Sequence, residues 1–385
     1  MLIGGINIPS LIYKLMDYLK DQIITYIGNK RKILPFIQSS LDKIGMKNYH
    51  FLDLFSGSGI VSRLAKVHGA SKITANDLEY YSSILNGVYL RNEEGNKEEF
   101  EEAKETVKGI MEKMELIYGK ESLGGWVTAN YAPKDDNNIQ RGERCFYTHN
   151  NAILIDEYLN FCFNEFSDYG YSRETANLLL ASLIVEASIH VNTSGVFKGF
   201  YKGKDGIGKF GGEGENALQR ILGEIDPKFP VFCSNQTENS IMKTDASRLI
   251  SVSPIEYDIA YIDPPYNQHP YGSNYFMLNA IAKNECPKEM SVVSGIPKDW
   301  NRSIYNKRRE GVERLLKDIE EIKSKYVILS YSSEAYLPIK DMVGELAKIG
   351  LITNLDEIDY NVFRGSRNLV QRKKKLQEYL ITIRK

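Results

Sequence analysis

The sequence predicts an α/β fold built on a mostly parallel, doubly wound sheet with a largely helical insertion. An apolar run over 51–54 ends in a glycine-rich turn and is followed by apolar residues at helical spacing. A second strand pattern over 72–77 precedes another helical pattern. Strand patterns return at 257–262 and 326–331, on either side of a helical pattern over 311–323. Alternating strands and helices are typical of parallel sheets.

The composition indicates a folded protein. Of the 385 residues, 42% are hydrophobic and 26% are charged, which excludes disorder as the main state. The 49 basic and 50 acidic side chains nearly cancel. A nucleic acid would therefore have to bind a local basic patch, because the molecule as a whole offers it no net attraction.

The middle third of the chain is different in character. Two helical patterns, at about 152–166 and 173–190, are surrounded by segments rich in glycine, aspartate and asparagine, and a charged helical segment precedes them. We predict one α/β domain made from both ends of the chain. Its first part spans residues 1–90, the insertion 91–235, and its second part 236–385.

Cysteine and histidine usage indicates no metal site. The four cysteines lie far apart without a Cys-x-x-Cys pair, and the five histidines form no ligand-spaced cluster with them. Neither zinc nor a disulfide framework is expected. No apolar run approaches the ~20 residues needed to cross a bilayer, so we expect no membrane association and a cytoplasmic location.

The glycine turn after the first strand suits a nucleoside cofactor. Gly57 and Gly59 have the spacing of a dinucleotide fingerprint, but Ser62 stands where a third glycine is expected. This departure disfavours an NAD-linked dehydrogenase. Asp77, which ends the second strand, is placed to accept hydrogen bonds from ribose hydroxyls.

A second motif follows the strand that ends at Ile262. Asp263, Pro264, Pro265 and Tyr266 combine an acid, a backbone with two amide donors removed, and an aromatic ring. A carboxylate and a carbonyl acceptor beside an aromatic face can hold a flat ring that carries an amino group. This motif is therefore predicted to be catalytic.

With these two motifs in this order, the chain resembles the Dam-like, amino-group-specific DNA methyltransferases, which form N6-methyladenine. The resemblance implies a class I S-adenosylmethionine-dependent fold, S-adenosylmethionine as cofactor and a target-recognition region in the insertion. It implies double-stranded DNA and a cognate restriction endonuclease as partners, in a prokaryotic cytoplasm, with no metal. It assigns the catalytic tetrad to Asp263–Tyr266. The implied cofactor-binding residues are Tyr26, Lys30, Asp53, Phe55, Gly57, Gly59, Asp77, Asp245 and Ala246.

Candidate DNA contacts lie in two segments. Asn192 begins a segment that resembles a family loop near DNA, and lysines follow it in a glycine-rich stretch. More basic residues follow the tetrad, and aromatic residues such as Phe197 and Tyr305 are interspersed. Contacts of basic side chains with phosphates give affinity without sequence preference. The predicted basic contacts are Lys198, Lys202, Lys204, Arg302, Lys307, Arg308 and Arg309.

These residues predict direct methyl transfer to a base that has been rotated out of the duplex. An exocyclic amine is a weak nucleophile, so acceptors at Asp263 and the Pro264 carbonyl would have to orient it. No cysteine is placed for a covalent ring adduct, which disfavours methylation of carbon 5 of cytosine. Two alternatives stay open: methylation of the N4 amino group of cytosine, and a non-catalytic nucleic-acid-binding module on the same fold.

Overall fold

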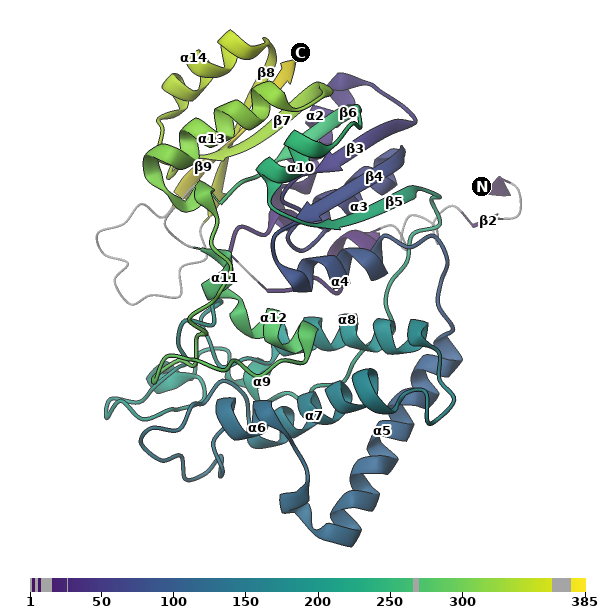
Figure 1. The fold of residues 1–385 in the computed structure, drawn as a ribbon, viewed down its shortest axis with the longest axis vertical. Helices are drawn as coiled ribbons and strands as arrows, with labels where there is room; N and C mark the ends of the chain where they lie inside the picture. The colour runs from purple at the N-terminus through teal and green to yellow at the C-terminus, as the bar shows by residue number, and fades with distance from the viewer. Residues whose placement is uncertain (1, 4–5, 8–15, 26, 266–269, 362–374) are drawn as a thin grey trace.

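A computed structural model describes residues 2–3, 6–7, 16–25, 27–265, 270–361 and 375–385. Its centre is a seven-stranded sheet in the order β5-β4-β3-β6-β7-β9-β8 (Figure 1). The first five strands in that order are parallel, and β9 runs antiparallel between β7 and β8. The strands are β3 (Tyr49–Asp53), β4 (Ala70–Asp77), β5 (Glu238–Lys243), β6 (Tyr257–Ile262), β7 (Ser324–Ser332), β8 (Leu351–Asn361) and β9 (Lys375–Arg384). Two short strands, β1 (Leu2–Ile3) and β2 (Ile6–Asn7), pair with each other.

Helices cover both faces of the sheet, which confirms the predicted doubly wound fold. Phe51 packs in a core with residues of α2 and α3, whereas its neighbour Leu52 packs in a core with residues of α10, α13 and α14. Strands that are buried on both faces have nearly continuous apolar sequences. This burial explains why β3 and β6 are apolar over most of their length. The covering helices are α2 (Leu34–Ile44), α3 (Ile60–His68), α10 (Ala246–Val252), α13 (Arg308–Glu321) and α14 (Ile339–Ile349).

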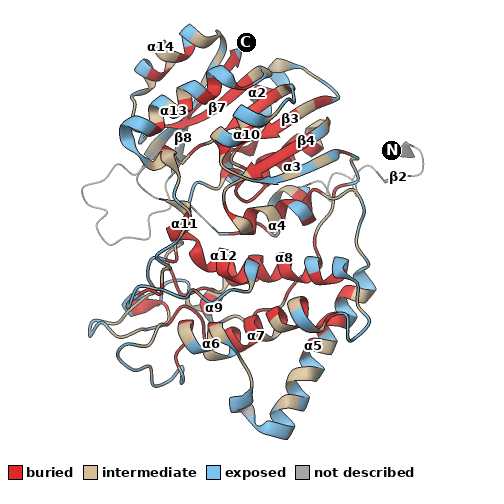
Figure 2. Ribbon diagram, viewed as in Figure 1, coloured by how far each residue is buried: buried red, intermediate tan, exposed pale blue. Residues whose placement is uncertain are grey.

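A separate helical layer lies against one end of this α/β unit (Figure 1). Its core is continuous from α4 and α12 through α8 to α7, and Figure 2 shows α8 and α12 as largely buried. Two of its helices, α4 and α12, come from outside the middle third of the chain. Its helices are α4 (Tyr80–Tyr89), α5 (Lys97–Tyr118), α6 (Trp126–Tyr131), α7 (His149–Asn160), α8 (Arg173–Ile189), α9 (Leu218–Leu222) and α12 (Phe276–Lys283). Short helical segments are η1 (Lys30–Ile33), η2 (Lys120–Ser122), the π-helical η3 (Phe161–Glu165), η4 (Gly212–Gly214), α11 (Tyr271–Asn274) and η5 (Ile304–Asn306).

The order of the strands reverses between β3 and β6. From β3 the sheet continues through β4 to β5, and from β6 it continues the other way through β7. The carboxyl ends of the two strands lie side by side, because Asp53 pairs with Tyr261. Ligands of open α/β sheets bind outside the carboxyl ends at such a reversal. The glycine turn after β3 and the Asp-Pro-Pro segment after β6 therefore meet at the expected place.

None of the described helices combines the length and apolar character needed to span a bilayer.

Candidate active site

The turn after β3 is held in shape by hydrogen bonds to the neighbouring strand end. The backbone N–H of Gly57, which has a positive φ of 49°, donates to Asp77 Oδ2 at 2.7 Å. The other oxygen, Asp77 Oδ1, accepts from the N–H of Glu79 at 2.9 Å. Gly59, at φ 76°, precedes α3, and a Cβ there would lie 2.5 Å from Asn86 Oδ1. Only glycine therefore fits this turn.

A buried hydrogen bond between Asp53 and Ser62 connects the end of β3 to α3, on either side of the turn. The Ser62 hydroxyl donates to Asp53 Oδ2 at 2.7 Å, and the Asp53 side chain is 1% exposed. Burial raises the pKa of Asp53 to about 7. Ser62, the residue that breaks the dinucleotide fingerprint, is thus the partner of this buried acid. Asp53 and Gly59 are not among the described residues that line the pocket beside the turn, and their contacts with a cofactor stay a prediction.

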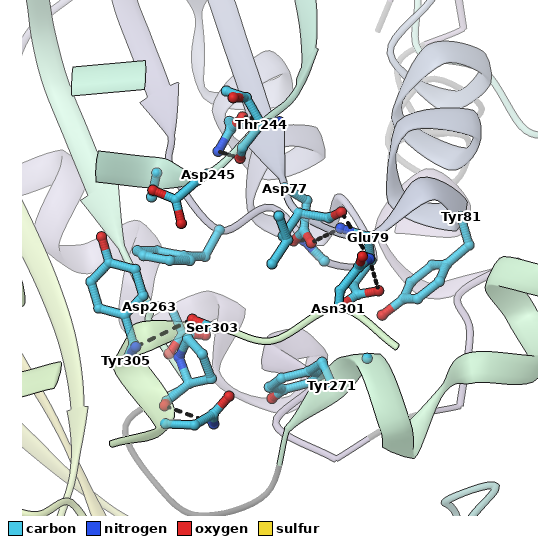
Figure 3. Close-up of a pocket in the computed structure, with 18 residues that line it drawn as sticks. Asp77, Glu79, Tyr81, Thr244, Asp245, Asp263, Tyr271, Asn301, Ser303 and Tyr305 are labelled. Carbon is cyan, nitrogen blue, oxygen red and sulfur yellow. Dashed lines mark hydrogen bonds between the residues drawn. The ribbon is translucent and has the colours of Figure 1, made fainter. Parts of the chain in front are cut away.

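The turn opens into a pocket, here called the first chamber (Figure 3). Its walls come from the ends of β3, β4, β5 and β6, from α11 and from the segment that leads to η5. In Figure 3, Asp245 and Tyr305 lie on one side of the chamber, and Glu79 and Asn301 lie on the other. Predicted site residues in its lining are Phe55, Gly57, Asp77, Asp245, Ala246, Asp263 and Pro265. Lining residues that the sequence analysis did not assign to the site include Glu79, Tyr271, Asn301, Ser303 and Asn306.

The lining of the first chamber is acidic. It contains four carboxylic acids and, among the described residues, no lysine, arginine or histidine. Burial raises the pKa of Asp77, and burial together with the Asp77 charge raises the pKa of Glu79 to about 7. Asn301 Nδ2 donates to Glu79 Oε2 at 2.9 Å, and the Asn279 side chain donates to the same oxygen. Crowded carboxyls of this kind favour a cationic ligand.

Aromatic side chains supply a flat wall in the same chamber. The rings of Phe55 and Tyr305 meet edge-to-face with centroids 5.0 Å apart. Tyr305 is 3% exposed, and its hydroxyl is bonded to Asp318 and, at 2.9 Å, to Ser247. The prediction placed Tyr305 among aromatic residues along DNA, but the structure places it in the chamber wall. This correction follows from the burial of the ring.

A second chamber lies on the other side of the Asp-Pro-Pro segment. It is lined by residues 23–25 and 27–33, which include η1, by Ser194 and Gly195 of the helical layer, and by residues of β7, β9 and the loop after β7. Three residues line both chambers: Asp263, Pro265 and Tyr271. The two chambers therefore meet at the Asp263 carboxylate, directly after β6.

Tyr271 joins the second chamber to the amino-terminal segment. Its hydroxyl donates to the Ile27 carbonyl at 3.0 Å, and a Cβ on Gly28, which has φ 82°, would lie 2.7 Å from that hydroxyl. The ring of Tyr275 stacks on Tyr271, and its hydroxyl accepts from the Ile27 N–H at 2.6 Å. The two tyrosines on successive turns thus fix the approach to η1.

Lys30 lines the second chamber and is absent from the lining of the first. Its ammonium lies 3.1 Å from Asp263 Oδ1 and 2.6 Å from Glu378 Oε1. The Lys30 ammonium thus forms an ion pair with the predicted catalytic acid, and its contact with the cofactor stays a prediction. Burial raises the pKa of Asp263 to about 6, and the Lys30 charge opposes that rise. Two residues of the predicted site, Tyr26 and Tyr266, lie outside the described residues.

The predicted DNA contacts fall into two groups. Asn192 is fully buried: its Nδ2 donates to the Cys145 carbonyl at 2.8 Å, and its Oδ1 accepts from the Gly211 N–H at 3.0 Å. We therefore assign Asn192 a structural role in holding the loop, in place of the predicted contact. The basic side chains lie at the surface: Lys198, Lys204, Arg302, Lys307, Arg308 and Arg309 are exposed, and Lys202 is partly exposed.

The basic surface residues also differ in how they are held. The Arg302 guanidinium stacks over Trp300 at 4.4 Å, and Lys202 lies 5.0 Å from the Phe200 ring centroid. Arg309 Nε donates to Glu313 at 2.9 Å. The described residues contain no group of three or more side chains arranged to hold a metal ion, and the four cysteines are free thiols.

Comparison with known proteins decides the family. A model of the D12 class N6 adenine-specific DNA methyltransferase family matches residues 26–178 and 227–343. This chain belongs to that family. The match includes the turn after β3, the Asp-Pro-Pro segment and Lys30, so the resemblance predicted from these motifs is confirmed. The chain is therefore an N6 adenine-specific DNA methyltransferase.

Curated relatives agree with this assignment. The chain is 32% identical to the type II methyltransferase M.CviAII of Paramecium bursaria Chlorella virus 1, over 85% of this chain and 89% of that protein. It is 26% identical to the type II methyltransferase M.NlaIII of Neisseria lactamica, over 89% and 93% of the two chains. It is 28% identical to the modification methylase LlaI of Lactococcus lactis, but there it covers only 55% of the relative.

Proposed function

We propose that this adenine methyltransferase binds S-adenosylmethionine in the first chamber and receives its target adenine, rotated out of double-stranded DNA, in the second. The observation that carries the proposal is that Asp263 and Pro265 line both chambers. A methyl donor and an amine acceptor have to meet at one point for direct transfer. The end of β6 is the point that both chambers share.

The first chamber fits the chemistry of S-adenosylmethionine. The Asp77 carboxylate can accept hydrogen bonds from ribose hydroxyls, and Phe55 and Tyr305 offer apolar surface to the adenine ring. The acidic lining suits the positive charges of the sulfonium and ammonium groups. When bound, this cofactor supplies a methyl group on positively charged sulfur. The protein has to position that group and stabilise the charge that develops on the acceptor nitrogen.

In the second chamber, we expect Asp263 and the Pro264 carbonyl to accept hydrogen bonds from the N6 amino group. These bonds direct the nitrogen lone pair at the methyl group, and they strengthen as positive charge moves onto nitrogen. A charge-assisted hydrogen bond contributes about 1.5–3 kcal/mol. Rotating a base out of the duplex costs a few kcal/mol, and stacking on Tyr266 is the contact we expect to offset part of that cost.

Surface features support binding of DNA across the mouth of the second chamber. Arg31 and Lys32 line this chamber and are exposed, and the exposed Lys198 lies in the loop that follows Ser194 and Gly195. We expect these side chains and Lys307 and Arg308 to contact phosphates. The helical insertion over 91–235 would then recognise the target sequence. We further propose that the chain acts in a prokaryotic cytoplasm together with a cognate restriction endonuclease.

The test is incubation with unmethylated DNA and isotopically labelled S-adenosylmethionine, followed by nucleoside mass spectrometry and mapping of the modified sites. We expect labelled N6-methyladenine at one recurrent sequence. Labelled N4-methylcytosine would favour the alternative reaction, methylation of the N4 amino group of cytosine. No labelled base, with normal DNA binding, would favour a non-catalytic module.

A further inference from the structure

The ammonium of Lys30 lies between two carboxylates at the boundary of the chambers. It is 3.1 Å from Asp263 Oδ1 and 2.6 Å from Glu378 Oε1. The side chains of Lys30 and Glu378 are 8% and 7% exposed, and that of Asp263 is 19% exposed. Glu378, which is not among the described residues that line the first chamber, is thus closer to the Lys30 ammonium than Asp263 is.

The sheet fixes the position of Glu378. Glu378 lies in β9 opposite Ser332 of β7, and the Ser330 hydroxyl donates to Glu378 Oε1 at 2.8 Å. A buried carboxylate is costly unless it is paired and hydrogen-bonded. Both requirements are met here, by Lys30 and by Ser330. The acid is therefore held in place on β9, whose other described residue in the lining of the second chamber is the apolar Leu376.

The three charged groups leave a net charge of −1 beside the proposed position of the amino group. Lys30 alone would neutralise Asp263 and compete with the adenine amine for its oxygens. Because the Lys30 ammonium is shared with Glu378, it binds Asp263 less strongly, and the Asp263 carboxylate keeps acceptor strength toward a nitrogen that becomes positive during transfer. Other titratable or polar groups that act on Asp263 are Asp53 on β3, Tyr261 on β6, Tyr271 on α11 and Ser330 on β7.

On the basis of the proposed function, we propose that Glu378 is a positioning residue for methyl transfer. It acts through Lys30 and sets how strongly that ammonium binds Asp263. The two partners have opposite effects on the catalytic carboxyl: the Lys30 charge lowers the pKa of Asp263, and the Glu378 charge raises it. Removing each partner should therefore move the titration of Asp263 in opposite directions.

The experiment compares the pH dependence of methylation in the wild type, Glu378→Gln and Lys30→Met at saturating DNA and S-adenosylmethionine. We expect Glu378→Gln to lower the pH-independent plateau of the rate by about tenfold or more, because one favourable charge is lost. We also expect it to move the acidic limb, which is the fall of the rate at low pH, to lower pH. We expect Lys30→Met to move the acidic limb to higher pH. Affinity for S-adenosylmethionine, measured by calorimetry, should stay close to wild type in Glu378→Gln.

Two further variants separate positioning from folding. Glu378→Asp keeps the charge and should restore part of the plateau rate and a near-normal acidic limb. Asp156→Asn is a matched control, because Asp156 is a buried carboxylate in the helical layer that accepts from the N–H groups of Gly125, Val127 and Thr128. It should lower thermal stability without moving the acidic limb.

A loss of rate in Glu378→Gln with an unmoved limb, or shifts in the same direction in both variants, would overturn the inference. Carboxyl NMR of the free protein, with the Asp263 resonance identified from Asp263→Asn, measures the same two shifts without methylation. If the wild type forms no N6-methyladenine but the resonance shifts as expected, the proposed function fails and the Lys30–Glu378 arrangement stands. If methylation is normal but the resonance does not move, only the inference on Glu378 fails.

Discussion

The two chambers differ in how the chain builds them. The first chamber is made mainly at the carboxyl ends of β3, β4, β5 and β6, where each strand is followed at once by the residues that line the pocket. The second combines residues 23–25 and 27–33 near the amino terminus, a loop of the helical layer, and residues of β7 and β9. A local strand–turn motif can be recognised in a sequence, whereas a pocket assembled from distant segments cannot.

The difference in charge is equally informative. The first chamber has acids and no basic side chain among the described residues that line it, whereas the lining of the second has both signs of charge. Its charged residues are Lys30, Arg31, Lys32, Asp263, Glu334 and Glu378. An acidic pocket suits a cationic methyl donor, and the exposed Arg31 and Lys32 suit the phosphates of DNA. Asp263 belongs to both environments, because it follows β6 directly and lines both chambers. The predictions below test this division, from the largest expected effect to the smallest.

Asp263→Asn should abolish most activity. The amide keeps the size of the side chain but loses the charge that favours a nitrogen becoming positive, so we expect the methylation rate to fall at least about 100-fold. DNA affinity and S-adenosylmethionine affinity, measured separately by titration, should change little. A rate within a few-fold of wild type would contradict the role of Asp263 as the shared acceptor.

Asp77→Asn should act on the first chamber alone. The substitution removes a charged acceptor for ribose hydroxyls and turns an amide N–H toward Gly57 or Glu79, so S-adenosylmethionine should bind at least about tenfold more weakly. Isothermal calorimetry measures this directly. Asp356→Asn, which removes an acid paired with Lys43 at the outer strand β8, is the control and should leave that affinity unchanged. Equal effects of the two variants would place the cofactor elsewhere.

The rate should fall on the acidic side with the titration of Asp263. Because burial raises the pKa of this carboxyl to about 6, the ionised form is present above that pH and is lost as the pH falls through it. We expect about a tenfold loss of rate for each pH unit well below the pKa. Single-turnover rates at saturating DNA and cofactor measure this limb. A flat profile down to a pH near the ordinary value of aspartate would contradict the raised pKa.

Replacing Lys307 and Arg308 together with alanine should weaken DNA binding by a similar factor for all sequences. Two lost phosphate contacts should reduce the slope of log Kd against log salt by about 2. Arg309→Ala should have a smaller effect, because its guanidinium is already paired with Glu313 at 2.9 Å. Anisotropy titrations over a range of salt concentrations distinguish these cases. An unchanged slope in the double variant would remove this segment from the DNA-binding surface.

Much of the fold could be predicted, because its elements are local. The strands that end at Asp77 and Ile262 have the expected limits at their carboxyl ends, and the turn at Gly57 lies beside Asp77 as its spacing suggested. The site residues that were missed or misplaced depend on tertiary contacts. Glu378 is one acid in the last strand, and only pairing of β9 with β7 brings it to Lys30. Asn192 is predicted at DNA, but its side-chain amide is bonded to the Cys145 carbonyl and to the Gly211 N–H.

The most direct test of the central claim is a crystal structure of this protein with the non-reactive S-adenosylmethionine analogue sinefungin. The account predicts that the analogue lies in the first chamber, with its ribose at Asp77 and the amine that replaces the methylsulfonium directed toward Asp263, while the second chamber is left for the base. An analogue bound in the second chamber beside Lys30, or one whose amine points away from Asp263, would contradict the account.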